Sequence, residues 1–144
     1  FMREALALAE NGRWSACPNP TVGAVLVRDG QVVARGWHHA AGQPHAEVEC
    51  LRDAQRQGID PAQCTLVVTL EPCNHYGKTP PCSEAVLAAG IKRVVIGLYD
   101  PTPKAAGVPN ACVPPVWKSS ARSASGNAAT RWPTSWPGSR AAPM

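Results

Sequence analysis

Residues 64–82 read CTLVVTLEPCNHYGKTPPC, a run of β-branched and aliphatic residues followed by a loop that begins and ends with cysteine. The run 64–70 predicts a strand, and its continuous apolar character predicts burial on both faces. Cys73 follows that strand in the loop, and Cys82 begins a segment, 82–89, with the pattern of a short helix. Because the start of a helix favours a thiolate, this stretch predicts cysteine thiolates at a strand–loop–helix junction.

The segments on either side of this stretch continue an alternation of strands and helices. Residues 21–27 and 31–37 are rich in β-formers and flank Asp29-Gly30, a dipeptide typical of tight hairpins. The other predicted elements are helices at 1–11 and 46–57 and a second buried strand at 94–98. This order favours an α/β fold in which helices pack on a mostly parallel sheet.

The composition is that of one globular domain with reduced cysteines. No apolar run approaches the roughly 18 residues needed to cross a bilayer, and the first segment carries Glu4 and Glu10, unlike a signal peptide. We therefore expect a cytoplasmic protein with no membrane association. Six cysteines in such a protein indicate metal binding or catalysis rather than a disulfide scaffold. Cys50 and Cys64 are expected to pack as small apolar residues.

The charge distribution argues against a nucleic-acid partner. All 10 acidic residues and all but four of the 14 Lys and Arg residues lie in 1–104, so this part is neutral overall. The net charge of +4 therefore arises from the last 40 residues. Nucleic-acid binding depends largely on Lys and Arg contacts to phosphates, so a small-molecule substrate is the better expectation.

His45, Cys73 and Cys82 are the candidate metal ligands. One imidazole and two thiolates suit zinc, and three protein ligands leave a fourth position open for water, as in catalytic sites. Glu47 lies two residues from His45, so on a helix it points to a different side and is expected to act as general acid/base rather than as a ligand. Taken singly, the same residues also fit a buried histidine, a surface glutamate and structural cysteines; together they match the zinc deaminase signature.

The spacing between the cysteines distinguishes families within that signature. Eight residues separate Cys73 from Cys82, and the sequence also contains PNPTVGAV at 18–25 and Gly-Trp-His at 36–38. These motifs resemble the riboflavin-biosynthesis deaminase family, the diaminohydroxyphosphoribosylaminopyrimidine deaminases, over about residues 2–107. The resemblance implies a three-layer α/β/α cytidine-deaminase-like fold with a mixed central sheet. It further implies one Zn²⁺ per chain and a homo-oligomer.

The resemblance also implies a reaction and a set of contacts. The expected substrate is 2,5-diamino-6-ribosylamino-4(3H)-pyrimidinone 5′-phosphate and the product 5-amino-6-(5-phosphoribosylamino)uracil, with Glu47 moving the protons. His75, Lys78 and Thr79 in the long loop are expected to bind the phosphate, because they offer hydrogen-bond donors beside the helix start at Cys82. The residues expected to bind substrate are Asn19, His38, the Ala46 amide, His75, Lys78, Thr79 and Asp100.

The last part of the chain departs from this pattern. The match stops near Gly107, and residues 108–144 contain no Leu, Ile, Asp or Glu. We expect a deaminase domain at 1–107, followed by an atypical tail that is out of frame or disordered, so that the C-terminal part of the fold is incomplete. The reductase that often accompanies this deaminase, and NADPH with it, is not expected in this chain.

Two alternatives to this interpretation stay open at the level of sequence. One is another deaminase of the same superfamily, acting on guanine, cytosine or a tRNA adenosine. The other is an inactive, truncated zinc-binding remnant, whose site would be closed by a fourth protein ligand. His75, two residues from Cys73, is the only obvious residue for that position.

Overall fold

The computed structural model describes residues 1–76 and 80–100. The expectations for Lys78, Thr79, the tail at 108–144 and the incomplete C-terminal part lie outside the described residues. Within them, every predicted helix and strand is present. The elements are α1 (Met2–Glu10), β1 (Gly23–Arg28), β2 (Gln31–Trp37), α2 (Ala46–Arg56), a short 3₁₀ turn (Pro61–Gln63), β3 (Thr65–Leu70), α3 (Cys82–Ala88) and β4 (Arg93–Leu98).

The four strands form one mixed sheet in the order β2-β1-β3-β4. Strand β1 is antiparallel to both β2 and β3, and only β3 and β4 pair in parallel. The prediction of a mostly parallel sheet was therefore wrong. The tight hairpin forces β1 against β2 in antiparallel pairing, and β3 then pairs with β1 rather than with β2. The mixed sheet implied by the family resemblance is confirmed.

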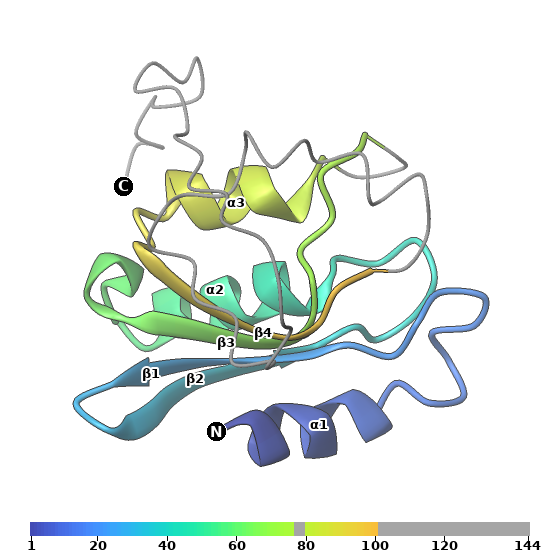
Figure 1. The fold of residues 1–144 in the computed structure, drawn as a ribbon, viewed down its shortest axis with the longest axis horizontal. Helices are drawn as coiled ribbons and strands as arrows, with labels where there is room; N and C mark the ends of the chain where they lie inside the picture. The colour runs from blue at the N-terminus through green and yellow to red at the C-terminus, as the bar shows by residue number, and fades with distance from the viewer. Residues whose placement is uncertain (77–79, 101–144) are drawn as a thin grey trace, which may run out of the picture.

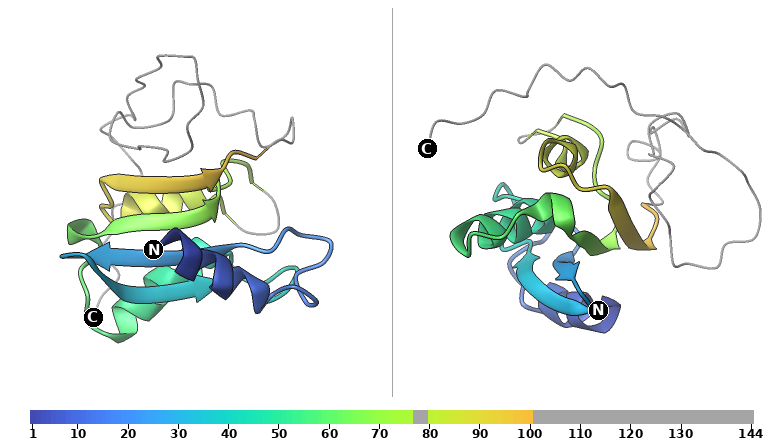
Figure 2. Two further views of the ribbon diagram at one scale, coloured as in Figure 1. Left: turned by 60° about the horizontal axis from the view of Figure 1, so that its bottom comes forward. Right: turned by 90° about the vertical axis from the view of Figure 1, so that its left-hand side faces the viewer.

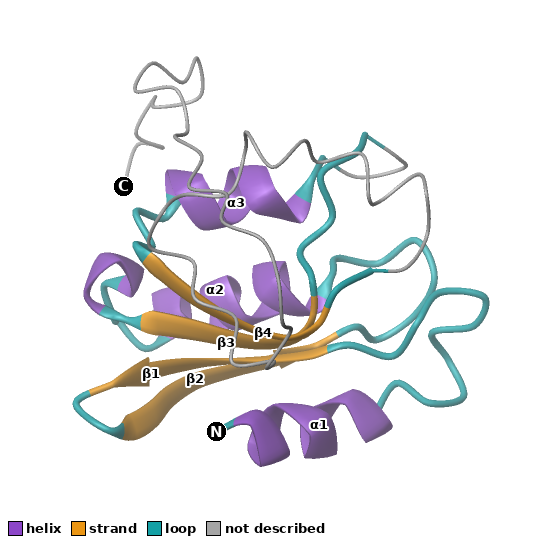
Figure 3. Ribbon diagram, viewed as in Figure 1, coloured by secondary structure: helices purple, strands orange, loops and turns teal. Residues whose placement is uncertain are grey.

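Helices cover both faces of this sheet. Figures 1 and 3 show α1 on one face, with α2 and α3 on the other. Ala5 of α1 packs against Val25, Val27 and Val67 in the smaller buried cluster. The larger cluster lies between the sheet and α2 and α3, and it includes Leu26, Ala34, Cys50, Leu66, Val68, Val86, Val94 and Ile96. Successive residues along a strand point to opposite faces of the sheet, so the apolar residues of the strands divide between the two cores.

Two local features shape the β1–β2 hairpin and its contact with α2. Asp29 and Gly30 have φ of 51° and 74°, the left-handed conformation that a two-residue hairpin turn requires. At Gly36 of β2, a Cβ atom would overlap the backbone of Ala46 and Cys50 in α2. The absence of a side chain there lets β2 and the first turn of α2 approach closely.

Strand β3 is buried on both faces as predicted, whereas β4 is not. In β4, Val94 and Ile96 are buried, but Leu98 is 62% exposed. Figure 2 shows β4 beside β3 at the outer edge of the sheet. As the outer strand of the described sheet, β4 lacks the cover that a central strand receives. In the described part of the chain, no helix has the length and apolar character needed to span a membrane.

Candidate metal centre

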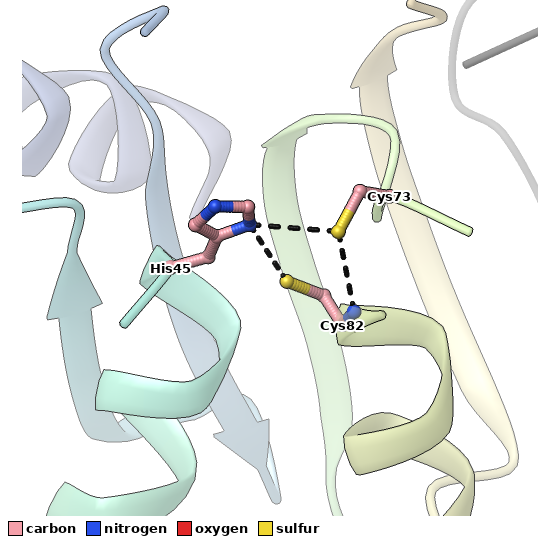
Figure 4. A group of neighbouring side chains, drawn as sticks. All are labelled: His45, Cys73 and Cys82. Carbon is pink, nitrogen blue, oxygen red and sulfur yellow. Dashed lines mark hydrogen bonds between the residues drawn. The ribbon is translucent and has the colours of Figure 1, made fainter. Parts of the chain in front are cut away.

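His45, Cys73 and Cys82 converge at one end of the sheet. The Nδ1 atom of His45 lies 2.9 Å from Sγ of Cys82 and 3.5 Å from Sγ of Cys73 (Figure 4). All three potential ligand atoms lie within 4.8 Å of one another. Zinc bonded to nitrogen and sulfur in a tetrahedron separates two such ligand atoms by about 3.5 Å. The three side chains therefore fit a single zinc ion, as predicted.

Each of the three residues lies at the end of a regular element. His45 is the N-cap of α2, Cys82 is the first residue of α3, and Cys73 follows the end of β3. At the start of α3 the backbone amide of Cys82 donates a hydrogen bond to Sγ of Cys73 at 3.2 Å, which favours the anionic form of that sulfur atom. The fold thus brings together three ligands that lie up to 37 residues apart in sequence.

The thiols and the imidazole perturb one another. The hydrogen bond from Cys82, reinforced by the bond to His45, lowers the pKa of Cys73 to about 4. The same pairing with Cys73, followed by burial, raises the pKa of Cys82, and the hydrogen bond to Cys73 raises the pKa of His45. These shifts favour a thiolate at Cys73 and a thiol at Cys82, and a divalent cation that binds both sulfur atoms displaces the remaining proton.

Glu47 lies on the first turn of α2 beside this cluster. Its side chain is only 3% exposed, and burial raises its pKa to about 7. Glu47 is not among the three residues whose ligand atoms cluster. A buried carboxyl group next to a metal site is typical of a general acid/base.

A pocket of ≈ 890 Å³ opens over the cluster and contains most of the predicted site residues. The predicted site residues that line the pocket are Asn19, His38, His45, Glu47, Cys73, His75 and Asp100. Ala46 is fully buried at the start of α2 and is not part of the lining, so the structure does not bring this residue to the pocket surface. The size of the pocket suits a small-molecule ligand.

Asn19 and His38 form a hydrogen-bonded pair in the pocket wall. Nδ2 of Asn19 lies 3.2 Å from Nε2 of His38, and Nδ1 of His38 lies 3.1 Å from the carbonyl oxygen of Pro44. Because a carbonyl oxygen only accepts, Nδ1 carries the hydrogen and Nε2 accepts from the Asn19 amide. His38 is 3% exposed and lines the pocket together with Asn19.

Sequence reasoning missed Glu71, which also lines the pocket. Its carboxylate accepts a hydrogen bond from the Asp100 amide at 3.3 Å, and its own amide donates to the carbonyl of Leu98. Burial raises the pKa of Glu71. The position of Glu71 directly after a buried strand was the available signal, since side chains at the carboxyl ends of strands in α/β sheets often line a site.

The structure also resolves several smaller expectations. Cys50 and Cys64 are buried among apolar residues, as predicted. His75 is exposed and outside the metal-ligand cluster, so the alternative in which it closes the site as a fourth ligand is not supported. Among the described residues, the cluster has three protein ligands, which leaves room for a water molecule or a substrate.

Comparison with known proteins gives a consistent result. Residues 1–98 match the family model of the cytidine and deoxycytidylate deaminase zinc-binding region. The chain is 51% identical over 107 residues to the riboflavin biosynthesis protein RibD of Escherichia coli, covering 74% of this chain but only 28% of that protein. A diaminohydroxyphosphoribosylamino-pyrimidine deaminase of Buchnera aphidicola is 47% identical over 107 residues, which cover 71% of its length.

A solved structure extends the likeness to three dimensions. The deaminase/reductase of Thermotoga maritima superposes with a TM-score of 0.70 at 50% identity, covering 73% of this chain and 30% of that one. The metal cluster, the fold and the relatives lead to one conclusion. The chain belongs to the cytidine and deoxycytidylate deaminase zinc-binding family, together with the diaminohydroxyphosphoribosylamino-pyrimidine deaminases of riboflavin biosynthesis.

Proposed function

We propose that this chain catalyses the hydrolytic deamination of 2,5-diamino-6-ribosylamino-4(3H)-pyrimidinone 5′-phosphate to 5-amino-6-(5-phosphoribosylamino)uracil. The observation that carries the proposal is one pocket lined by the buried Glu47 and by two of the three clustered ligands, His45 and Cys73. Since the chain spans 28% of the length of the E. coli relative, the proposal concerns the deamination step alone, with residues 1–107 as the catalytic domain.

In this reaction a water molecule replaces the amino group on C2 of the ring, and ammonia leaves. Zinc held by His45, Cys73 and Cys82 would supply the Lewis acidity that activates the water. Glu47 takes the proton released by the water and delivers protons to the ring nitrogen and then to the leaving amine. Its burial keeps this carboxyl group aligned and shielded from bulk water.

Asn19 and His38 orient the ring. His38 takes one hydrogen of the Asn19 amide, and the Oδ1 atom of Asn19 can accept a hydrogen bond from a ligand in the pocket. An acceptor at this point in the wall suits a ring that carries amino groups. His38 positions Asn19 through this hydrogen bond.

The phosphate of the substrate is bound by the loop between the two cysteines. His75 lines the pocket from this loop, and Lys78 and Thr79 follow it in sequence. A cation and hydroxyl or imidazole donors offer charge-assisted hydrogen bonds to a phosphate. A neutral domain needs such local donors to hold an anionic substrate.

The direct test is ammonia release by purified protein of known zinc content. The phosphorylated diaminopyrimidinone is compared with guanine, cytidine and an adenosine-containing tRNA stem-loop, each beside a Glu47→Gln control. We expect release from the phosphorylated pyrimidinone only, with about one zinc per chain. Turnover of another compound in the panel, or none at all from fully zinc-loaded protein, would refute the proposed substrate.

A further inference from the structure

The link between the two cysteine ligands is unusually long for a pair that binds one metal ion. Eight residues separate Cys73 from Cys82, whereas many zinc sites take two cysteines from a Cys-x₂₋₄-Cys segment. A short link holds its two sulfur atoms near each other by chain geometry alone. A longer link has more conformations to lose when its ends are brought together, so it needs other contacts to fix them.

The structure provides such contacts at the base of the loop. The amide of Cys82 donates to Sγ of Cys73 at 3.2 Å, and the amide of Ser83 donates to the carbonyl oxygen of Cys73 at 3.2 Å. The hydroxyl of Ser83 donates to Oδ1 of Asn74 at 2.8 Å. Asn74 and Ser83 each follow one of the cysteine ligands directly in sequence, so this bond ties the two ligand positions together.

Burial distinguishes the Ser83–Asn74 hydrogen bond from the other side-chain hydrogen bond between this loop and α3. Ser83 is only 2% exposed, so loss of its partner leaves a hydroxyl without compensation in a place that water does not reach. Tyr76 also bridges the loop to α3, through a 2.6 Å hydrogen bond to Glu84. However, Tyr76 is 73% exposed, and water replaces that bond at little cost.

We propose that Asn74 and Ser83 form a clasp that positions the two sulfur ligands for zinc. The clasp replaces the restraint that a short Cys-x-x-Cys link supplies by its length. It fixes the base of the loop, where the two ligands lie. Asn74 and Ser83 are thus positioning residues and touch neither metal nor substrate.

The test measures the metal site directly and requires no substrate. Zinc release from Ser83→Ala, Asn74→Ala and the double variant is followed with a chromogenic chelator, and Tyr76→Phe is the matched control. Cobalt replaces zinc in a parallel set, because its thiolate charge-transfer and ligand-field bands report the ligand geometry. We expect roughly tenfold faster release from each single variant, by the usual scale of effects around metal ligands.

The double variant decides whether the two residues act as one device. If they do, it releases zinc no faster than the single variants, because both remove the same bond. We expect altered cobalt bands in all three clasp variants, and wild-type release and bands in Tyr76→Phe. Release rates or bands equal to those of the control, or single effects that add in the double variant, overturn the proposal. Should Ser83→Ala fail to fold, Asn74→Ala against Tyr76→Phe decides. None of these outcomes depends on the deaminase activity.

Discussion

The two sides of the metal centre are built in different ways. The helix side consists of His45 and Glu47, which α2 presents from a turn whose neighbouring residues are buried in the larger core. The loop side consists of Cys73 and Cys82, at the two ends of a long loop that hydrogen bonds close. Packing therefore fixes the general acid/base and one ligand, and a few directional bonds fix the other two ligands. Substitutions on the two sides should fail in different ways.

The largest effect is expected from Glu47→Gln on the helix side. The amide keeps the shape of the side chain but accepts and delivers no proton, so turnover should fall by roughly a hundredfold to ten-thousandfold. Because Glu47 is outside the ligand cluster, the variant should retain its zinc. Ammonia release and metal content are measured on one preparation. Loss of zinc together with activity would show that Glu47 is a ligand after all.

The support of the helix side is tested by Gly36→Ala. The added methyl group meets the backbone of Ala46 and Cys50, which cannot move aside as a flexible side chain does. We expect the free energy of unfolding, measured in urea, to fall by about 3 kcal/mol. Gly42→Ala is the control, since its Cβ meets nothing and only its φ of 82° is unfavourable. Gly42→Ala should lower the free energy of unfolding by about 1 kcal/mol. An equal loss of stability in both variants would contradict the packing argument.

The helix side was also the easier one to predict from sequence. His45 and Glu47 are two residues apart at the start of one periodic segment, so local rules place them close together, just as Asp29-Gly30 specifies the β1–β2 turn. The pairing of β3 with β1, and hence the mixed sheet, depends on contacts between distant segments that no local pattern encodes. The same holds for the bonds of Ser83 to Asn74 and of Glu71 to Asp100, because hydrogen-bond partners depend on where loops fold back.

Substrate orientation by the pocket wall gives an intermediate effect. Asn19→Leu removes the acceptor that the wall presents, and the Michaelis constant should rise by about tenfold, as for one lost hydrogen bond, with a smaller change in kcat. His38→Leu removes the partner of the Asn19 amide and should raise the Michaelis constant by a similar factor. Because His38 acts through Asn19, the double variant should be no worse than either single one. Additive effects measured by steady-state kinetics would mean that His38 contacts the substrate independently.

The smallest effect is expected on the outer part of the loop side, from Lys78→Ala. A single lysine facing a solvated phosphate contributes little, because water and salt screen the pair, so the Michaelis constant should rise by only about fivefold. The metal content should stay unchanged, since the clasp and not the outer loop holds the sulfur atoms. The matched measurement uses the same pyrimidinone without its phosphate, for which wild type and variant should bind alike. A rise that persists with the dephosphorylated compound would place Lys78 against the ring or the ribose. Zinc loss in Lys78→Ala would instead show that the outer loop and the ligands are not separable.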